Sequence, residues 1–282
     1  MKNVTILTDS TAYLPNETIA DLPVEVLPLT LTWDGVSYRD GVDILPDEFY
    51  TRMRSSSTLP VTSQVNVNTF NEVFKKLLDA GRSVLVLPIS SGISGTVHSA
   101  LSAKENFPGA PIEVMDTLLV SMALGFQVLA AARASKEGAS LEECKRIAME
   151  AYNHIGVYFV VDTLKYLHAG GRIGGAQRLL GTALNIKPIL MIKDGKIDAV
   201  KSVITMRKAI TTMMDLVEEG IAGQNPVHIS VFHAGVNDAA VEIMKHTTQR
   251  FHPHESILSH VSPVVGSHVG PGTVSIAYMA GM

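Results

Sequence analysis

Short apolar segments of strand length alternate with longer segments of helical period along this 282-residue chain. Residues 4–7 and 84–87 are predicted to be buried strands. Between them, apolar residues recur with helical spacing from Val67 to Leu78, and Gly81 is placed to end that helix. Such alternation is typical of α/β proteins, in which helices pack against a largely parallel sheet. We therefore expect an α/β fold.

The remaining elements follow from turn, capping and periodicity signals. Asp34-Gly35 and Asp194-Gly195 suit two-residue hairpin turns, because both residues of such a turn tolerate positive φ. Ser140 and Glu143 match a capping box at the start of a helix. Further helices are predicted over residues 46–55, 94–106, 118–132, 141–154, 206–219 and 238–250, and further strands over residues 113–115, 157–161 and 228–232.

The length of the chain corresponds to about two domains of roughly 150 residues each. After residues 157–161 the sequence becomes rich in glycine, and the second hairpin follows. We place the boundary near residue 158 and predict two α/β domains, residues 1–158 and residues 159–282.

Composition restricts the classes of protein to which the chain can belong. Its single cysteine, Cys144, cannot form an intrachain disulfide, which favours a reducing compartment. A net charge of −4 does not favour nucleic acid or an anionic membrane as a partner. Asp9 interrupts the apolar stretch that a signal peptide needs, and the uncharged residues 117–132 fall short of the roughly 20 in a membrane-spanning helix. We expect a cytoplasmic protein with no transmembrane segment and no nucleic-acid partner.

Standard signatures of nucleotide, nucleophile and metal sites are incomplete in this sequence. The glycines at residues 170–175 lack the G-x-G-x-x-G spacing, and Gly195-Lys196 is not followed by the serine or threonine of a Walker A loop. Residues 92–95 are one residue short of a nucleophile elbow. The two histidines of residues 252–254 alone make a weak metal motif. We therefore expect neither a metal ion nor a cofactor.

Hydroxyl side chains gather instead where a strand should end. Ser90, Ser91, Ser94 and Thr96 lie between a predicted strand and a predicted helix. In a doubly wound sheet that position is the carboxyl edge, where ligands bind. Ser94 at the helix start would leave free N–H groups facing a phosphate or a carboxylate. The alternative is that Ser94 only caps its own helix.

Two further clusters allow the same two interpretations. Residues 58–64 offer hydroxyls and an amide ahead of a helix that begins near Val65, or they supply only its N-cap. Residues 267–273 place His268 beside a Gly-Pro-Gly sequence, whose glycines would let the backbone approach a ligand closely. The alternative there is a structural histidine. Arg172 and Arg207, which lie beside glycines or at a helix start, are either functional or simply solvated.

Short motifs that follow one another along the chain carry a family resemblance. They occupy residues 6–11, 38–43, 60–64, 91–96, 162–167, 170–173, 186–190, 205–207 and 268–272. In this order they resemble the DegV family of bacterial fatty-acid-binding proteins. Each motif alone is weak, but together they are specific and cover essentially the whole chain.

The resemblance implies a two-domain α/β fold: an α/β/α domain with a mainly parallel sheet, and a second, two-layer α/β domain with a mixed sheet. It also implies a non-catalytic carrier that binds one long-chain fatty acid, such as palmitate, in a buried tunnel. Carried over by motif position, the residues expected to hold the carboxyl group are Thr62 and Ser94, with Ser63, Gly95, Thr96 and His268 beside them.

The resemblance further implies a protein partner. In related proteins a separate fatty-acid kinase phosphorylates the bound carboxylate to an acyl phosphate, which enters phospholipid synthesis. By position, Arg172 and Arg207 match residues through which such proteins meet the kinase or its phosphoryl donor. We therefore expect a fatty-acid kinase subunit as a partner.

An enzyme is the alternative interpretation, because the DegV fold is related to that of the substrate-binding subunit of dihydroxyacetone kinase. A small-molecule kinase or lyase-like enzyme of this kind would act on a phosphorylated or carbonyl compound. His268 or Asp116 would then serve as the general base.

Composition suits the expected tunnel but does not say which apolar residues line it. The chain has 12 methionines and one tryptophan, and flexible thioether side chains conform well to a flexible acyl chain. Met122 and Phe126, on the uncharged predicted helix, are the residues that we expect to line it.

Overall fold

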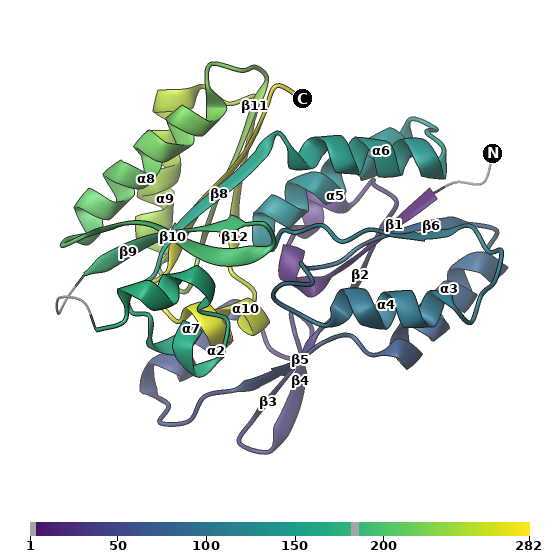
Figure 1. The fold of residues 1–282 in the computed structure, drawn as a ribbon, viewed down its shortest axis with the longest axis horizontal. Coiled ribbons are helices and arrows are strands. Elements are labelled where there is room, and N and C mark those ends of the chain that lie inside the picture. The colour runs from purple at the N-terminus through teal and green to yellow at the C-terminus, as the bar shows by residue number, and fades with distance from the viewer. Residues whose placement is uncertain (1–3, 182–185) are drawn as a thin grey trace.

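A four-stranded parallel sheet forms the centre of the first lobe (Figure 1). In this computed structural model, which describes residues 4–181 and 186–282, its strands run in the order β2-β1-β6-β7. They are β1 (Val4–Asp9), β2 (Val24–Leu27), β6 (Ser83–Leu87) and β7 (Ile112–Val114). Every residue of β6 is buried, as expected of a central parallel strand with a nearly continuous apolar sequence. The predicted parallel sheet is confirmed.

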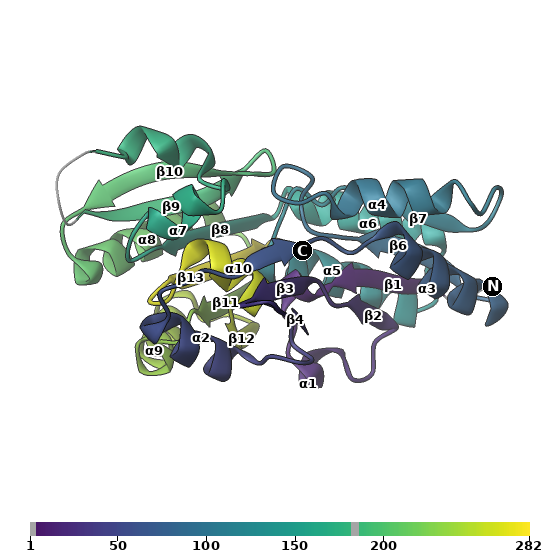
Figure 2. The same cartoon turned by 90° about the horizontal axis from the view of Figure 1, so that it is seen from below.

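Four helices cover the two faces of this sheet (Figures 1 and 2). They are α3 (Val67–Asp79) and α4 (Thr96–Lys104) on one face, and α5 (Ser121–Lys136) and α6 (Leu141–Tyr152) on the other. Ser140 and Glu143 form the predicted capping box at the start of α6. The predicted helix 118–132 is observed as α5, which is buried on nearly all sides because it packs against α6, β1 and the second lobe. The expected α/β/α arrangement is confirmed.

The second lobe contains a six-stranded mixed sheet with the order β10-β9-β8-β13-β11-β12. Its strands are β8 (Ile155–Val160), β9 (Lys187–Lys193), β10 (Lys196–Val203), β11 (Val227–His233), β12 (Glu255–His260) and β13 (Val274–Ala280). Only β11 and β12 pair in parallel. Positive φ at Asp194 and Gly195 closes the predicted β9–β10 hairpin. The expected mixed sheet is confirmed.

The two faces of the mixed sheet have different neighbours. Helices α8 (Met206–Ile221) and α9 (Asn237–Phe251) cover one face, where Tyr158 and Val160 pack. Val157 and Phe159 alternate with them and face the first lobe. β8 begins at Ile155, so residue 158, near which we place the domain boundary, lies inside this strand. The change of sheet falls between the end of α6 and the start of β8.

A small antiparallel sheet with the order β4-β3-β5 projects from the first lobe and packs against the second (Figure 1). It consists of β3 (Thr30–Trp33), β4 (Val36–Arg39) and β5 (Val61–Ser63), with α2 (Pro46–Ser55) between β4 and β5. Positive φ at Asp34 and Gly35 confirms the first predicted hairpin. Shorter elements are η1 (Ser10–Ala12), α1 (Asn16–Ile19), α7 (Lys165–Ala169) and η2 (Gly174–Leu179).

Two clusters predicted as loops are partly regular structure. Thr62 and Ser63, expected in a loop before a helix, belong to β5, and the helix begins only at Val67. His268, expected in a glycine-rich loop, lies in the last turn of α10 (Pro263–Val269). Pro263 fits the first turn of α10, and Ser262 caps it by accepting a hydrogen bond from the Val265 N–H (3.2 Å). The proline and the N-cap favour this helix, although the glycine within it lowers the helix propensity.

The longest helices among residues 4–181 and 186–282 are α5 and α8, each of 16 residues. Neither these nor the other helices in the described part of the chain have the length and apolar character needed to span a bilayer.

A buried carboxyl group joins the small sheet to both lobes. Asp40, just after β4, accepts hydrogen bonds from the Ser10 hydroxyl (2.7 Å) and from the Val264 N–H at the start of α10 (3.2 Å). Burial raises the pKa of Asp40 to about 7, although these hydrogen bonds act to lower it. The proton bound to Asp40 is therefore linked to the stability of the fold.

We expect Asp40→Asn to change how stability depends on pH. The carboxyl group titrates near 3.8 when unfolded and about 7 when folded, so the folded state holds the extra proton between these values. The wild type therefore loses stability relative to the variant as pH rises through this interval, by on the order of 1 kcal/mol per pH unit. Urea denaturation between pH 5 and 8 would show the stability difference moving in favour of the variant up to about pH 7 and levelling above it.

Other titrating groups are common to both proteins and cancel in this difference. His233, whose pKa burial lowers to about 4, is one of them. Parallel stability profiles for wild type and variant would contradict the assignment to Asp40.

Candidate functional site

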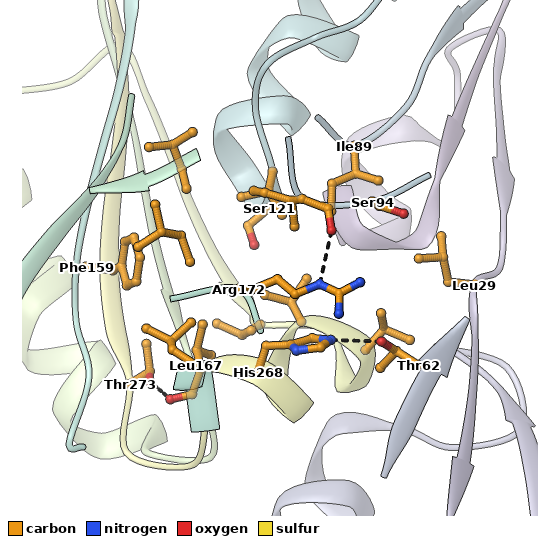
Figure 3. Close-up of a pocket in the computed structure, with 18 of the residues that line it drawn as sticks. Leu29, Thr62, Ile89, Ser94, Ser121, Phe159, Leu167, Arg172, His268 and Thr273 are labelled. Atoms are coloured by element: carbon orange, nitrogen blue, oxygen red, sulfur yellow. Dashed lines mark hydrogen bonds between the residues drawn. The ribbon is translucent and has the colours of Figure 1, made fainter. Parts of the chain in front are cut away.

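A cavity of about 330 Å³ lies where the two lobes and the small sheet meet (Figure 3). This volume falls within the roughly 300–1,000 Å³ of typical small-molecule sites. Its walls come from β5, the loops after β6 and β7, the start of α5, strands of the six-stranded sheet, and α7 and α10. Segments distant in sequence therefore build one site.

Most of the cavity wall is apolar. Fourteen of its 24 lining residues are aliphatic or aromatic: Leu29, Ile89, Ile93, Val120, Val157, Phe159, Leu167, Ile192, Ile197, Phe232, Val261, Val264, Val265 and Val269. The register of the six-stranded sheet places two of these residues on either side of a serine. Ser275 on β13 is paired with Phe159 on β8 and with Phe232 on β11. The three side chains form a row across the face that the sheet turns to the cavity.

A hydrogen bond between two cavity-lining side chains joins β5 to α10. The Thr62 hydroxyl lies 2.8 Å from His268 Nε2, a hydrogen bond between residues 206 positions apart (Figure 3). Ser63 lines the same wall. The other ring nitrogen, His268 Nδ1, is buried, has no hydrogen-bond partner among residues 4–181 and 186–282, and packs against Gly170.

This environment determines the state of the His268 ring. Burial, together with the nearby charge of Arg172, lowers the pKa of His268 to about 4, so the ring is neutral at pH 7. A proton on Nδ1 would be a buried donor without an acceptor, which is rarer and more costly than an unused acceptor. We therefore assign the proton to Nε2, which donates to Thr62. The Thr62 hydroxyl is left free to donate into the cavity.

The loop after β6 supplies the second group of hydroxyls. Ser94 lines the cavity, and its Oγ lies 3.0 Å from the hydroxyl of Thr96 at the start of α4. The Thr96 N–H also donates to Ser94 Oγ, at 3.3 Å. Ser94 therefore both contacts the cavity and partly caps α4, whereas Thr96 is buried behind it. Gly95, the N-cap residue, lines the cavity beside the Gln64 amide, which an added Cβ would overlap.

Arg172 lies between the Thr62–His268 pair and the Ser94 loop and donates hydrogen bonds to backbone carbonyls. Its Nε donates to the Ile93 carbonyl at 3.2 Å, and its Nη1 donates to the Gly170 carbonyl at 2.8 Å. Figure 3 shows the guanidinium between the Ser94 loop and the Thr62–His268 pair. Arg172 lines the cavity and is also exposed, so it lies at the cavity mouth.

Two residues singled out from the sequence lie apart from this site. Arg207 lies at the start of α8, on the opposite side of the six-stranded sheet, where it borders a groove between α8 and α9. Asp116 is not among the cavity-lining residues. Its carboxylate accepts hydrogen bonds from the Ser91 N–H and hydroxyl and from the Leu118 N–H, and so holds two loops together.

The prediction of which residues line the tunnel is wrong. Met122 and Phe126 are completely buried in the protein core and do not line the cavity. None of the methionines in residues 4–181 and 186–282 lines it. Because α5 is apolar on all sides, its sequence does not indicate which face turns to the cavity.

Four polar cavity residues were not predicted as site residues: Gln64, Ser121, Thr273 and Ser275. Gln64 belongs to the cluster of residues 58–64, so the sequence already indicated this segment as a candidate site. Ser275 could be placed only by the register of β13, and Ser121 only by knowing where α5 begins.

The described residues contain no group of three histidine, cysteine, aspartate or glutamate side chains that could hold a metal ion. Within the weak H-x-H motif, the His254 ring instead packs edge-on against His228, with the ring centroids 5.6 Å apart.

Comparisons with known proteins agree with this architecture. A model of the DegV family matches residues 3–281. A DegV domain-containing protein from Listeria innocua is 34% identical over 278 residues, which is 98% of each chain. The structure of a DegV family protein from Thermus thermophilus, described for its fatty acid binding, is 34% identical, with a TM-score of 0.93 and 99% of each chain covered.

A third relative is described by the particular ligand that it binds. The structure of a stearic-acid-binding protein from Eubacterium ventriosum is 26% identical, with a TM-score of 0.91, and the match covers 100% of this chain and 99% of that one. The family match over nearly the whole sequence and the relatives above 30% identity lead to one conclusion. The chain belongs to the DegV family.

Proposed function

We propose that this protein binds a long-chain fatty acid non-covalently in the cavity between its lobes, as a carrier rather than a catalyst. The observation that carries the proposal is the composition of the cavity wall, which is mainly aliphatic and aromatic with a smaller number of hydroxyl and other polar side chains. An acyl chain with a single acid group has the matching distribution of apolar and polar surface. The fatty-acid-binding relatives support the same ligand class.

The energetics require that the acyl chain be enclosed. A saturated 16-carbon acid has roughly 14 methylenes, and about 0.8 kcal/mol for each gives a gross gain of about 11 kcal/mol. Association costs of about 4–15 kcal/mol offset much of that gain. The polar groups therefore contribute orientation and specificity more than affinity.

Thr62 and Ser94 are proposed to hold the carboxyl group, with Ser63 and Gly95 beside them. The Nε2 proton of His268 leaves the Thr62 hydroxyl free to donate to a carboxylate oxygen. The positive charge of Arg172 at the cavity mouth favours the ionised form of the acid. Thr96 acts indirectly, by orienting the Ser94 hydroxyl.

The same residues argue against an enzyme that uses His268 or Asp116 as its base. A neutral histidine with a pKa of about 4 is a weak proton acceptor at pH 7. The Asp116 carboxylate is engaged in loop contacts outside the cavity wall. Small-molecule catalysis at this site would need another base.

A fatty-acid kinase is the proposed partner, with the cytoplasm as the place where the two meet. Arg172 is exposed at the cavity mouth, where a second protein would reach the acid group. Arg207 lies on the far side of the six-stranded sheet, so a contact there would be separate from the one at the mouth.

Removing one of the two proposed carboxyl-binding hydroxyls should weaken ligand retention. We expect Thr62→Val and Ser94→Ala each to lower the affinity for palmitate about tenfold, the effect of losing one hydrogen bond to a charged group. Native mass spectrometry after exchange with labelled palmitate would measure occupancy. Thr211→Val, on the exposed face of α8, is the matched control and should retain wild-type occupancy. Full occupancy in both cavity variants would contradict the carboxyl assignment.

The packing of His268 on Gly170 provides an independent test. The backbone of Gly170 has φ −79°, which any residue adopts, but a Cβ would overlap His268 Nδ1. We expect Gly170→Ala to displace the ring, break the Thr62–His268 hydrogen bond and reduce palmitate occupancy in the same exchange assay.

The adjacent glycine supplies the control for this variant. Gly171 has φ +68° and open space around its Cβ position, so Gly171→Ala should cost stability through backbone strain without moving His268. If Gly170→Ala retained palmitate as well as Gly171→Ala does at equal stability, the role given to His268 would be wrong.

A further inference from the structure

Two histidine rings lie against each other at the carboxyl ends of β11 and β12. His233 and His260 are the last residues of these parallel strands and are paired in their register. Their ring centroids are 4.5 Å apart. On its other side His260 meets the edge of the Tyr13 ring, which comes from the first lobe, with the ring centroids 6.4 Å apart. We call His233 and His260 the histidine pair.

The histidine pair adjoins the wall of the cavity. Phe232 immediately precedes His233 and lines the cavity. Val261 immediately follows His260 and lines it as well. Adjacent residues of a strand point to opposite faces, so the His233 ring lies on the reverse side of the sheet from Phe232. A displacement of the pair would therefore move two residues of the cavity wall.

Hydrogen bonds hold the same strand ends against the first lobe and α2. The Ser259 hydroxyl on β12 donates to the Tyr13 carbonyl at 2.7 Å. Tyr50 on α2 donates its hydroxyl proton to the Val261 carbonyl at 2.8 Å. The histidine pair is therefore part of the contact that closes the cavity on this side.

Neither ring of the pair can become charged without an unfavourable change in its contacts. His233 Nδ1 accepts a hydrogen bond from the Val236 N–H at the start of α9 (3.2 Å), so the neutral ring carries its proton on Nε2. A second proton, on Nδ1, would displace this hydrogen bond. A charged His260 ring would carry a proton on Nδ1, which is buried and has no acceptor in the described part of the chain. The closed contact therefore favours two neutral rings.

The surrounding charges do not reverse this preference. Burial, together with the charge that His260 can carry, lowers the pKa of His233 to about 4, and burial also lowers the pKa of His260. Asp47 on α2 acts in the opposite direction on both rings, but burial has the larger effect. The titratable and charged groups of the elements around the pair are Tyr13, Asp40, Asp47, Tyr50, Arg54 and, in the first turn of α9, Asp238.

We infer that the histidine pair is an acid-sensitive switch, whose protonation separates β11 and β12 from Tyr13 and α2 and releases the ligand from the cavity. This inference rests on the proposed function and adds a means of regulating it. In the open form the rings regain an ordinary pKa of about 6.5. The open form therefore binds the extra protons between about pH 6.5 and 4, and the closed form loses stability relative to it as pH falls through this interval.

The titration of His233 alone sets the expected size of the effect. Its pKa is about 4 in the closed form and about 6.5 in the open form. Lowering the pH from 7.5 to 5 should then raise the population of a minor open form about 30-fold. Release of a bound fluorescent fatty acid into excess phosphatidylcholine vesicles would measure this change as a release rate.

The double variant His233→Asn, His260→Phe removes the titration while keeping the local contacts. The Asn amide oxygen can accept from the Val236 N–H as Nδ1 does, and the Phe ring can pack as the His260 ring does. We expect its release rate to rise less than about threefold over the same pH interval. Protonation of the ligand, Asp40 and His268 is common to all the proteins, so it cancels from the comparison. His246→Gln, which removes an exposed histidine of α9, is the matched control and should behave as the wild type.

Hydrogen exchange of the ligand-free wild type tests the same opening without a variant. After correction for the intrinsic pH dependence of exchange, the amides of residues 234–238 and 261–265 should lose protection between pH 7.5 and 5, and those of β1 and β6 should not. Equal pH dependence of release in the wild type and the double variant would overturn the inference, as would an unchanged exchange pattern. If the wild type bound no fatty acid at pH 7.5, the proposed function would fail instead, and exchange would still test the switch.

Discussion

Hydrogen bonds that cross between the lobes hold open a space that apolar side chains would otherwise close. An empty cavity lined by valine, isoleucine and phenylalanine is unfavourable, because each lining group loses packing contacts. Polar contacts between the lobes oppose this collapse. The Ser90 hydroxyl donates to the Gly195 carbonyl across the lobes at 2.8 Å, and Thr62 pairs with His268 on another side. The shape of the cavity therefore depends on these polar contacts between the lobes.

The two faces of the six-stranded sheet have different roles: one packs against helices and the other lines the cavity. Residues that alternate along β8 face either α8 or the cavity, as Tyr158 and Phe159 do. The helix-covered face supplies a packed core that does not border the cavity. The cavity face can therefore vary in shape while the other face maintains the lobe.

Periodicity and turn chemistry predicted much of the fold, because they are local. The Asp-Gly hairpins, the capping box of Ser140 and the buried β6 strand depend only on neighbouring residues. The three-residue strand β5 is too short to show a period, and the glycine within α10 hides a helix that Ser262 caps. For the site, a strand-to-helix loop drew attention to Ser94. The partner of His268 lies on a distant strand, and nothing near it in the sequence indicates the pairing.

The small sheet and α2 take their partners from a much later part of the chain. Tyr50 on α2 donates its hydroxyl proton to the Val261 carbonyl at 2.8 Å, and Asp40 and Thr62 find their partners between residues 264 and 268. During translation, the side chains of residues 40–62 therefore emerge about two hundred residues before the groups that they contact. The first lobe can form its parallel sheet early, but the cavity is completed only when α10 and β13 have been synthesised. Until then, the apolar wall of the future cavity is exposed to chaperones and to other nascent chains.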